Sequence, residues 1–264
     1  MMKFVKKAFF PILKSRYSSK ITKEEARRIR TFKNKFKGKR CFIVGNGPSL
    51  NKIDLTLLES EYTFGVNSIF FKTKEMGFKP TFYAVEDKHV LDDNLNEIKK
   101  FDCEYKFFPS FYRDKTSNDG NNFYLPFDVG FYREEHPFFE VPRFSKDVSK
   151  VVYAGQTVTY FNLQLAFYMG FEEVYLVGMD FDYKIPDSAK ISEATIESTE
   201  DDPNHFHPDY FGKGKKWHDP KLNAVLLNYE KAKEQFELNG RKILNATDGG
   251  KLELYDRVPY DLLF

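Results

Sequence analysis

The segment RCFIVGNGPSL, residues 40–50, constrains the fold more than any other part of the sequence. A short apolar run ends at Gly45-Asn46-Gly47-Pro48-Ser49, which is typical of a buried strand that stops in a tight turn. Proline is tolerated in the first helical turn, so we expect a helix to begin at or just after Pro48. Such a junction directs amide groups and the positive end of a helix at one point, where a phosphate binds well. The turn is neither a GxGxxG fingerprint nor a P-loop, and an ordinary βα turn is the alternative interpretation.

Strand-like and helix-like segments alternate after this junction. This alternation predicts a Rossmann-like α/β fold with a mostly parallel sheet and helices on both faces. We expect a single domain over residues 39–264, preceded by a basic arm over residues 1–38. Strands are expected at 40–44, 62–66, 81–85, 104–108, 151–153, 173–177 and 241–244, and helices at 158–169 and 221–238.

The charges are balanced overall but unevenly distributed. The 41 basic and 39 acidic residues nearly cancel, so no global field favours a nucleic acid partner. Residues 1–40, however, carry many Lys and Arg, interleaved with apolar residues, against only Glu24 and Glu25. This arm could lie on an anionic membrane surface, or it could be a solvated basic helix packed on the domain edge. The two cysteines form no disulfide or metal-binding pattern, which favours a cytoplasmic protein, at the inner face of the plasma membrane if the arm binds lipid.

Polar residues recur where the predicted strands end. Asn46 follows the first strand, Asn67-Ser68 the second, Glu86-Asp87 the third, and Asp180 the strand at 173–177. Gln156-Thr157 directly precedes the helix at 158–169. Ligands bind at the carboxyl ends of strands in open parallel sheets, so this recurrence predicts a binding site there.

The segment 181–220 has no periodicity, and we expect it to form a functional lid over that site. It holds His205, His207 and His218 together with the single Trp. Histidine is the natural general base near neutral pH, and Lys and Tyr can hold a phosphate. His205, His207 and Asp209 could instead bind a metal, but their spacing matches no zinc site, and we predict none. The alternative is that these histidines only pack against neighbouring side chains or cap backbone groups and take no part in chemistry.

Four pieces of the sequence resemble the bacterial sialyltransferases that use CMP-sialic acid and the related MptE-like (6-hydroxymethylpterin diphosphokinase-like) family. The order and approximate spacing of these pieces agree over residues 40–212. The pieces are Gly45–Leu50 followed by Ile53-Asp54, then Val66–Phe71, Gly170–Phe181 and Asn204–Phe206.

The resemblance implies roles for particular residues. It assigns Asn46 and Asn67 to contacts with the donor nucleotide and its phosphate, and Asp180 to the shape of the donor site. Two positions depart from the family pattern. A Tyr that holds the leaving phosphate is replaced by Asp182, with Tyr183 one residue further on, and the family's catalytic His corresponds to Asp209.

The resemblance implies a glycosyltransferase that moves an acidic, sialic-acid-like sugar from a CMP-activated donor, with inversion, to a surface glycan or lipid-linked acceptor. No cofactor is expected, because the CMP-sugar is a substrate. The alternatives are an ATP- and Mg²⁺-dependent diphosphokinase of the MptE type and a nucleotide-binding protein without enzymatic activity. The predicted catalytic residues are His205, His207 and Asp209, and the predicted substrate- or nucleotide-binding residues are Gly45, Asn46, Gly47, Ser49, Asn67, Ser68, Glu86, Gln156, Thr157, Asp180, Tyr183 and Tyr210.

Overall fold

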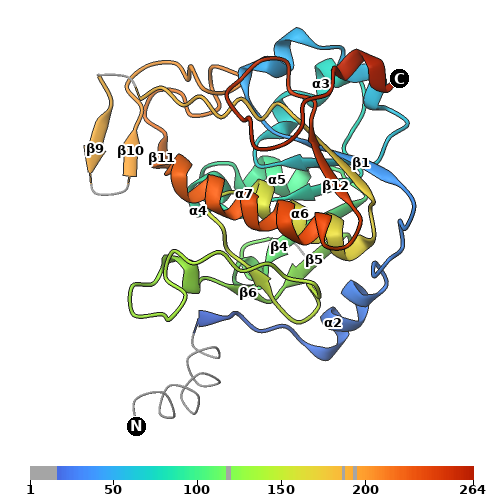
Figure 1. Cartoon of the computed structure of the whole chain (residues 1–264). Coiled ribbons are helices and arrows are strands. Elements are labelled where there is room, and N and C mark those ends of the chain that lie inside the picture. The colour runs from blue at the N-terminus through green and yellow to red at the C-terminus, as the bar shows by residue number, and fades with distance from the viewer. Residues whose placement is uncertain (1–16, 117–119, 186–187, 193–194) are drawn as a thin grey trace.

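The centre of the molecule is a sheet of seven strands, all parallel (Figure 1). The computed structural model describes residues 17–116, 120–185, 188–192 and 195–264. The strand order is β12-β8-β1-β2-β3-β4-β5. From β1 the chain adds strands β2 to β5 on one side of the sheet and then β8 and β12 on the other, so the order of the strands reverses between β1 and β8. Parallel sheets bind ligands in the crevice at such a reversal. The strands are β1 (Arg40–Val44), β2 (Thr63–Val66), β3 (Phe82–Ala84), β4 (Tyr105–Pro109), β5 (Asn122–Leu125), β8 (Glu173–Val177) and β12 (Lys242–Asn245).

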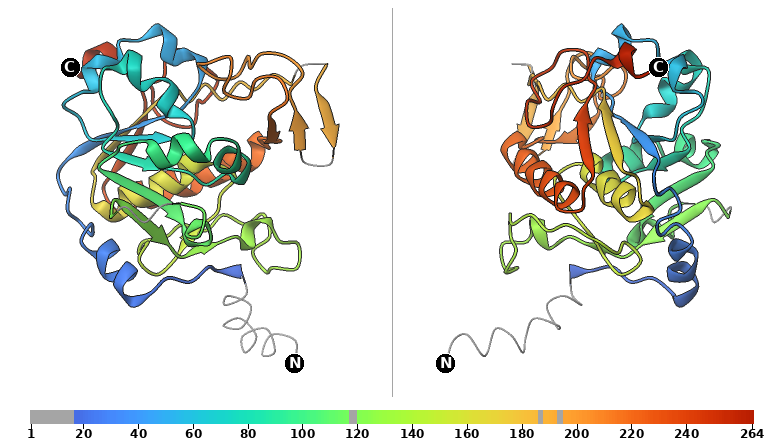
Figure 2. Two further views of the ribbon diagram at one scale, coloured as in Figure 1. Left: turned by 180° about the vertical axis from the view of Figure 1, so that it is seen from behind. Right: turned by 45° about the vertical axis from the view of Figure 1, so that its right-hand side comes forward.

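Helices cover both faces of this sheet, as the views from opposite sides show (Figures 1 and 2). The α6 and α7 helices lie on one face, and α3, α4 and α5 on the other. Alternate side chains of β1 enter two separate cores, with Cys41 and Ile43 on the α6 side and Phe42 and Val44 on the α4 side. The helices are α2 (Lys23–Arg30), α3 (Thr73–Met76), α4 (Lys88–Asp93), α5 (Leu95–Lys100), α6 (Val158–Met169) and α7 (Leu222–Glu237).

The α/β architecture predicted from the sequence is confirmed, with two local corrections. The helix expected at Pro48 is one short 3-10 helix, Pro48–Lys52. The strand expected at 151–153 exists as β7 (Val152–Tyr153), but it pairs with β6 (Phe127–Asp128) in a separate two-stranded sheet. All twelve residues of α6 are buried, so this helix has no solvent face and its sequence shows little periodicity.

The lid over residues 181–220 contains regular structure that its sequence did not predict. Three short antiparallel strands, in the order β11-β10-β9, form a small sheet that projects from the body of the molecule (Figure 1). Ile196 and Trp217 are buried and anchor it. The strands are too short for an alternating pattern to emerge. They are β9 (Lys190–Ser192), β10 (Thr195–Glu197) and β11 (Lys216–His218).

The described part of the basic arm packs on the domain. Thr22 and Glu25 form a capping box at the start of α2, and Ala26, Ile29 and Phe32 are buried. Residues 17–38 are therefore packed on the domain edge, while residues 1–16 lie outside the described part. Within the residues that the structure describes, no helix combines the length and apolarity needed to cross a membrane.

Candidate functional site

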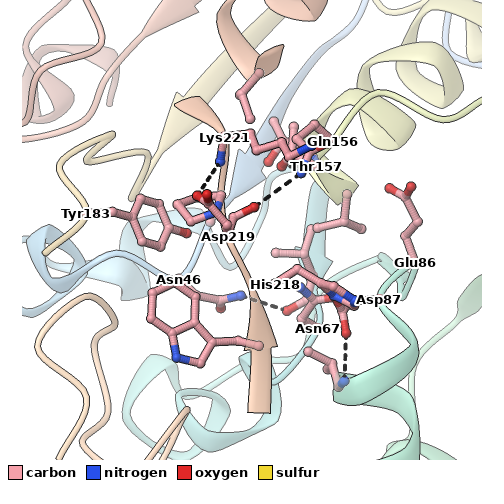
Figure 3. Close-up of a pocket in the computed structure, with 18 of the residues that line it drawn as sticks. Asn46, Asn67, Glu86, Asp87, Gln156, Thr157, Tyr183, His218, Asp219 and Lys221 are labelled. Carbon is pink, nitrogen blue, oxygen red and sulfur yellow. Dashed lines mark hydrogen bonds and ion pairs between the residues drawn. The ribbon is translucent and has the colours of Figure 1, made fainter. Parts of the chain in front are cut away.

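A cleft of about 790 Å³ opens at the carboxyl ends of β1, β2, β3 and β8, beside the point where the strand order reverses. The lid and the first residues of α4, α6 and α7 complete its walls (Figure 3). This is the place where polar residues at the strand ends were expected to meet. The predicted site residues that line the cleft are Gly45, Asn46, Gly47, Asn67, Glu86, Gln156, Thr157, Asp180, Tyr183 and His205.

The glycine turn after β1 packs directly against the loop after β8. A Cβ atom on Gly47 would lie 1.8 Å from Oδ2 of Asp180, and one on Gly45 would lie 2.5 Å from the carbonyl oxygen of Gly178. The amides of Gly45 and Gly47 donate to the carbonyls of Val177 and Gly178, at 2.7 and 3.0 Å. The two glycines are therefore required by the close approach of two backbones.

The carboxylate of Asp180 occupies the position at this turn where a phosphate was expected. Its Oδ2 accepts from Ser49 Oγ at 2.7 Å, and its Oδ1 accepts from the Ser49 amide at 3.2 Å. The short 3-10 helix at Pro48 offers little dipole, and the amides of Ser49 and Leu50 donate to Asp180 and to the Gly47 carbonyl oxygen. A phosphate at this turn would therefore have to displace the Asp180 carboxylate from Ser49.

Asn46 and Asn67 form the floor of the cleft, and Tyr210 lies beneath Asn46 without lining the cleft. The Asn46 Nδ2 donates to the carbonyl oxygen of Val66 at 3.1 Å and to Tyr210 Oη at 2.9 Å. The Oδ1 atoms of Asn46 and Asn67 are buried and have no hydrogen-bond partner among the described residues. Both are acceptors, so they suit a ligand that brings amino or hydroxyl donors.

The amino ends of α4, α6 and α7 all face the cleft, and that of α6 lies in its wall beside Gln156. The N-cap of α6, Thr157, accepts from the Thr159 amide at 3.3 Å, and both residues line the cleft. Gln156 is held in the left-handed region at φ 67°, and its Nε2 donates to the carbonyl oxygen of Asp219 at 3.3 Å. Asp219 also accepts from the Lys221 amide at 3.0 Å, which joins the start of α7 to the same wall (Figure 3).

Tyr132 connects two predicted site residues. Its hydroxyl donates to Glu86 Oε1 at 3.2 Å and accepts from the Gln156 amide at 3.0 Å. The other carboxyl oxygen of Glu86 is buried without a partner among the described residues. Burial raises the pKa of Glu86 to about 7, with a further contribution from Asp87 and against the hydrogen bond from Tyr132.

Three histidines line the cleft, and two of them, His205 and His218, are each paired with an aspartate, while the ring of His89 lies 4.5 Å from that of His218. His205 Nδ1 lies 2.7 Å from Asp202 Oδ2, and its ring stacks on Tyr210 with ring centroids 3.9 Å apart. Burial opposes ionisation of Asp202, but its hydrogen bonds with His205 and with the amides of Asn204 and Phe211 lower its pKa. Only 7% of the His205 side chain is exposed.

The second pair is His218 and Asp87, which the lid and the end of β3 contribute. His218 Nδ1 lies 3.0 Å from Asp87 Oδ2, and 45% of the His218 side chain is exposed. The hydrogen bond to Asp87 raises the pKa of His218 against the effect of burial. Asp87 also caps α4 through its Oδ1, which accepts from the amides of His89 and Val90 at 2.7 and 3.0 Å.

Five predicted residues lie outside the cleft wall. Ser49 and Ser68 are buried, and Tyr210 accepts a hydrogen bond from Asn46 without lining the cleft itself. His207 stacks on Phe71 with ring centroids 4.9 Å apart, and the Asp209 side chain is 76% exposed beside it. The structure therefore gives none of these five residues a direct position against a ligand in the cleft.

The sequence prediction missed three residues that shape the site. Asp202 precedes His205 by three residues, a spacing that could have indicated the pair. His218 was noticed in the lid but not placed in the site, and Tyr132 lies in a segment with no motif. In the part of the chain that the structure describes, no three His, Cys, Asp or Glu side chains are grouped so that they could hold a metal ion.

A model of the MptE-like family, described as 6-hydroxymethylpterin diphosphokinase MptE-like, matches residues 15–186. This match spans more than half of the 264 residues. The chain belongs to the MptE-like family. The matched part of this MptE-like protein contains the glycine turn, Asn67, Asp87 and Asp180, and it ends before His205 and His218.

Two further comparisons were made for the MptE-like protein. No curated protein matched its sequence. Among solved structures, it is similar to the MAf glycosyltransferase from Magnetospirillum magneticum AMB-1, with 15% sequence identity and a TM-score of 0.49. The similarity covers 90% of this chain and 38% of that chain, so the MptE-like protein spans well under half of the length of the MAf glycosyltransferase.

Proposed function

We propose that this protein is a glycosyltransferase that moves an acidic, sialic-acid-like sugar from a CMP-activated donor to a hydroxyl group of a surface glycan or lipid-linked acceptor. One observation carries the proposal. Three features line the same cleft: Asn46 and Asn67, whose Oδ1 atoms have no partner among the described residues, the positive end of α6, and the pair of His218 and Asp87. Its volume of about 790 Å³ is in the range of small-molecule sites.

The nucleoside would lie on the floor of the cleft. The unpartnered Oδ1 atoms of Asn46 and Asn67 require hydrogen-bond donors, which a cytosine amino group and ribose hydroxyls provide. These oxygens would repel a phosphate, whose oxygens are acceptors. The resemblance to the sialyltransferases implies that these asparagines contact the donor nucleotide and its phosphate, and the geometry favours the nucleoside contact.

The donor phosphate would lie against the start of α6. This helix is twelve residues long, and Thr157, Val158 and Thr159 at its amino end line the cleft. Tyr183 and Lys221 line the same space and can donate to phosphate oxygens as the bond to the sugar breaks. Tyr183 would thus serve where the family has a Tyr one residue earlier.

His218 would be the general base. With Nδ1 hydrogen-bonded to Asp87, its Nε2 is left to take a proton, and the side chain is accessible from the cleft. The acceptor hydroxyl loses its proton to Nε2, its oxygen forms a bond to the anomeric carbon, and the bond from that carbon to the phosphate breaks to release CMP. His205 is the second candidate, because it is also paired with an aspartate but is far less exposed.

The family name supplies the competing function, a diphosphokinase that would use ATP and Mg²⁺. Its metal ligands would come from Glu86, Asp87, Asp180 and Asp182. Three of these carboxylates are engaged elsewhere: Asp87 with His218, Asp180 with Ser49, and Asp182 with Lys251 at 2.7 Å. They would have to leave these partners to bind a metal, which favours the glycosyltransferase.

A thermal-shift panel with CMP, CDP, UDP and ATP, each with and without Mg²⁺, separates the candidates. We expect CMP to raise the melting temperature without metal, and the Asn46→Ala and Asn67→Ala variants to lose that shift. Stabilisation by ATP only with Mg²⁺ would support the diphosphokinase instead. No response to any nucleotide would exclude both enzymes.

A further inference from the structure

We propose that the amino edge of the central sheet is a docking surface for an anionic membrane. This surface, here called the cationic edge, is independent of the proposed enzymatic function. It consists of two turns at the far end of the strands from the cleft. Its members are Arg30, Lys33, Lys37, Lys39, Leu238, Arg241 and Lys242.

Contacts with one helix end bring the two turns together. The Asn34 amide donates to the carbonyl oxygen of Tyr168 at 3.0 Å, and Arg241 Nη1 donates to that of Phe167 at 2.6 Å. Both carbonyls belong to the last turn of α6. Figure 1 shows the segment after α2 passing the ends of α6 and α7 on one side of the molecule, while the lid lies on the other.

The cations of this edge have no described carboxylate partners. Arg30, Lys33, Lys37, Lys39 and Lys242 are exposed, and none forms an ion pair within the described residues. Some surface lysines elsewhere are paired, as Lys79 is with Asp102 at 2.6 Å, whereas this edge brings together several cations with no described ion-pair partner. Two acids lie nearby. The amide of the exposed Glu172 donates to the Lys39 carbonyl oxygen, and the half-buried Glu173 stands in register with Lys242 and accepts from Tyr175 Oη at 2.9 Å. The edge therefore presents a net positive charge to a partner.

The cations are carried on a fixed backbone. Phe32 and Phe36 are buried between the lysines, and Phe36 stacks on Phe171 with ring centroids 4.9 Å apart and planes at 4°. The Phe36 amide donates to the Met169 carbonyl oxygen at 2.9 Å. Because the backbone is already ordered, binding would not require this segment to fold.

Leu238 distinguishes a lipid partner from other anions. Its side chain is 70% exposed, and it ends α7 three residues before Arg241. An exposed apolar side chain among cations suits the boundary between lipid headgroups and acyl chains. Nucleic acid would gain from the same charges but would give Leu238 no apolar contact.

Docking through this edge orients the cleft. β1 begins at Arg40, beside the cationic edge, and ends at Val44, directly before the glycine turn in the cleft. The length of the strands, about 15–20 Å, separates the two. A bound protein would leave its cleft open on the side away from the lipid, where it could meet an acceptor that projects from the membrane.

Vesicle co-sedimentation of the full chain tests this proposal. We expect binding to phosphatidylcholine vesicles that contain about 30% phosphatidylglycerol, loss of binding at high salt, and little binding to phosphatidylcholine alone. The K33E/K37E/K39E variant should bind about tenfold or more weakly. A matched control, K184E/K213E/K216E, makes the same change of net charge in the lid and should bind within about threefold of the unmodified chain.

Residues 1–16 are present in all of these proteins, so they cannot account for a difference between the variants. Leu238→Ser should weaken vesicle binding without changing binding to heparin. The proposal is overturned if K33E/K37E/K39E binds vesicles normally while circular dichroism shows both variants folded. Equal losses in both triple variants, or binding to heparin but not to vesicles, would overturn it as well.

Discussion

The Asp180 carboxylate accepts a hydrogen bond from Ser49 Oγ at 2.7 Å and lies against the amide of the same residue, so the glycine turn carries an internal anion. This contact ties the loop after β8 to the start of the 3-10 helix after β1, at the point where the strand order reverses. The turn therefore shapes the cleft, and in the proposed function the donor phosphate lies against α6 instead.

Ser49→Ala should act on stability more than on ligand binding. It removes a charge-assisted hydrogen bond from a buried residue, which we expect to cost about 1–2 kcal/mol in the free energy of unfolding. The CMP affinity should change less than about twofold, as calorimetry can measure. Loss of CMP binding with normal stability would show that Ser49 contacts the ligand.

Asn46→Ala should affect both binding and stability. Asn46 lines the cleft and has a buried oxygen without a partner among the described residues, and its amide nitrogen also donates to Val66 and Tyr210. We expect weaker CMP binding by about 1–3 kcal/mol and a loss of about 1 kcal/mol in unfolding free energy. Chemical denaturation and calorimetry on the same variant would check both values, and unchanged affinity would remove Asn46 from the site.

Asp87→Asn should shift the pH dependence of turnover. A base must be neutral, and Asp87 raises the pKa of His218, so the acid limb of kcat should be shifted upward from the pKa of an ordinary histidine. Without the carboxylate this limb should move to lower pH, and turnover on the plateau should fall roughly 10–10²-fold. Asn still caps α4, so the fold is kept. An unchanged limb would mean that another group is the base.

Glu86→Gln should stabilise the protein at neutral pH. The pKa of Glu86 is raised to about 7, so the folded state resists ionisation that the unfolded chain undergoes near its ordinary pKa. The unmodified protein therefore loses stability as the pH rises from about 4.5 to 7, and the variant lacks this loss.

The two proteins should be equally stable near about pH 4, and the variant should be more stable by about 1–2 kcal/mol near about pH 8, allowing for water in the cleft. Denaturation at the two pH values makes the comparison. Parallel stability curves would show that Glu86 ionises freely in the folded protein.

The sequence predicted the parallel sheet because strands buried on both faces read as short apolar runs, such as Phe42 to Val44 before the glycine turn. It also placed Asn46, Asn67, Glu86 and Asp180 near one another, because the ends of parallel strands share one edge. The lid strands escaped prediction, because three residues are too few for a periodic pattern.

The choice among the lid histidines could not be made from the sequence. His205, His207 and His218 look alike as residues in a polar loop, and their environments differ only through distant partners. His207 stacks on Phe71, His205 stacks on Tyr210, and His218 is hydrogen-bonded to Asp87, which follows β3. Likewise, nothing local to Asp180 reveals that it binds Ser49 across the reversal of the sheet.

The most direct test of the account is the release of CMP from CMP-N-acetylneuraminic acid by the unmodified protein and by His218→Ala and His205→Ala, without added metal. We expect CMP release by the unmodified protein, a loss of roughly 10²–10⁴-fold in His218→Ala with CMP affinity retained, and a smaller loss in His205→Ala. If the unmodified protein neither binds nor releases CMP, and binds ATP only with Mg²⁺, the glycosyltransferase is contradicted. If His205→Ala is inactive while His218→Ala works normally, the pair of Asp202 and His205 is the base.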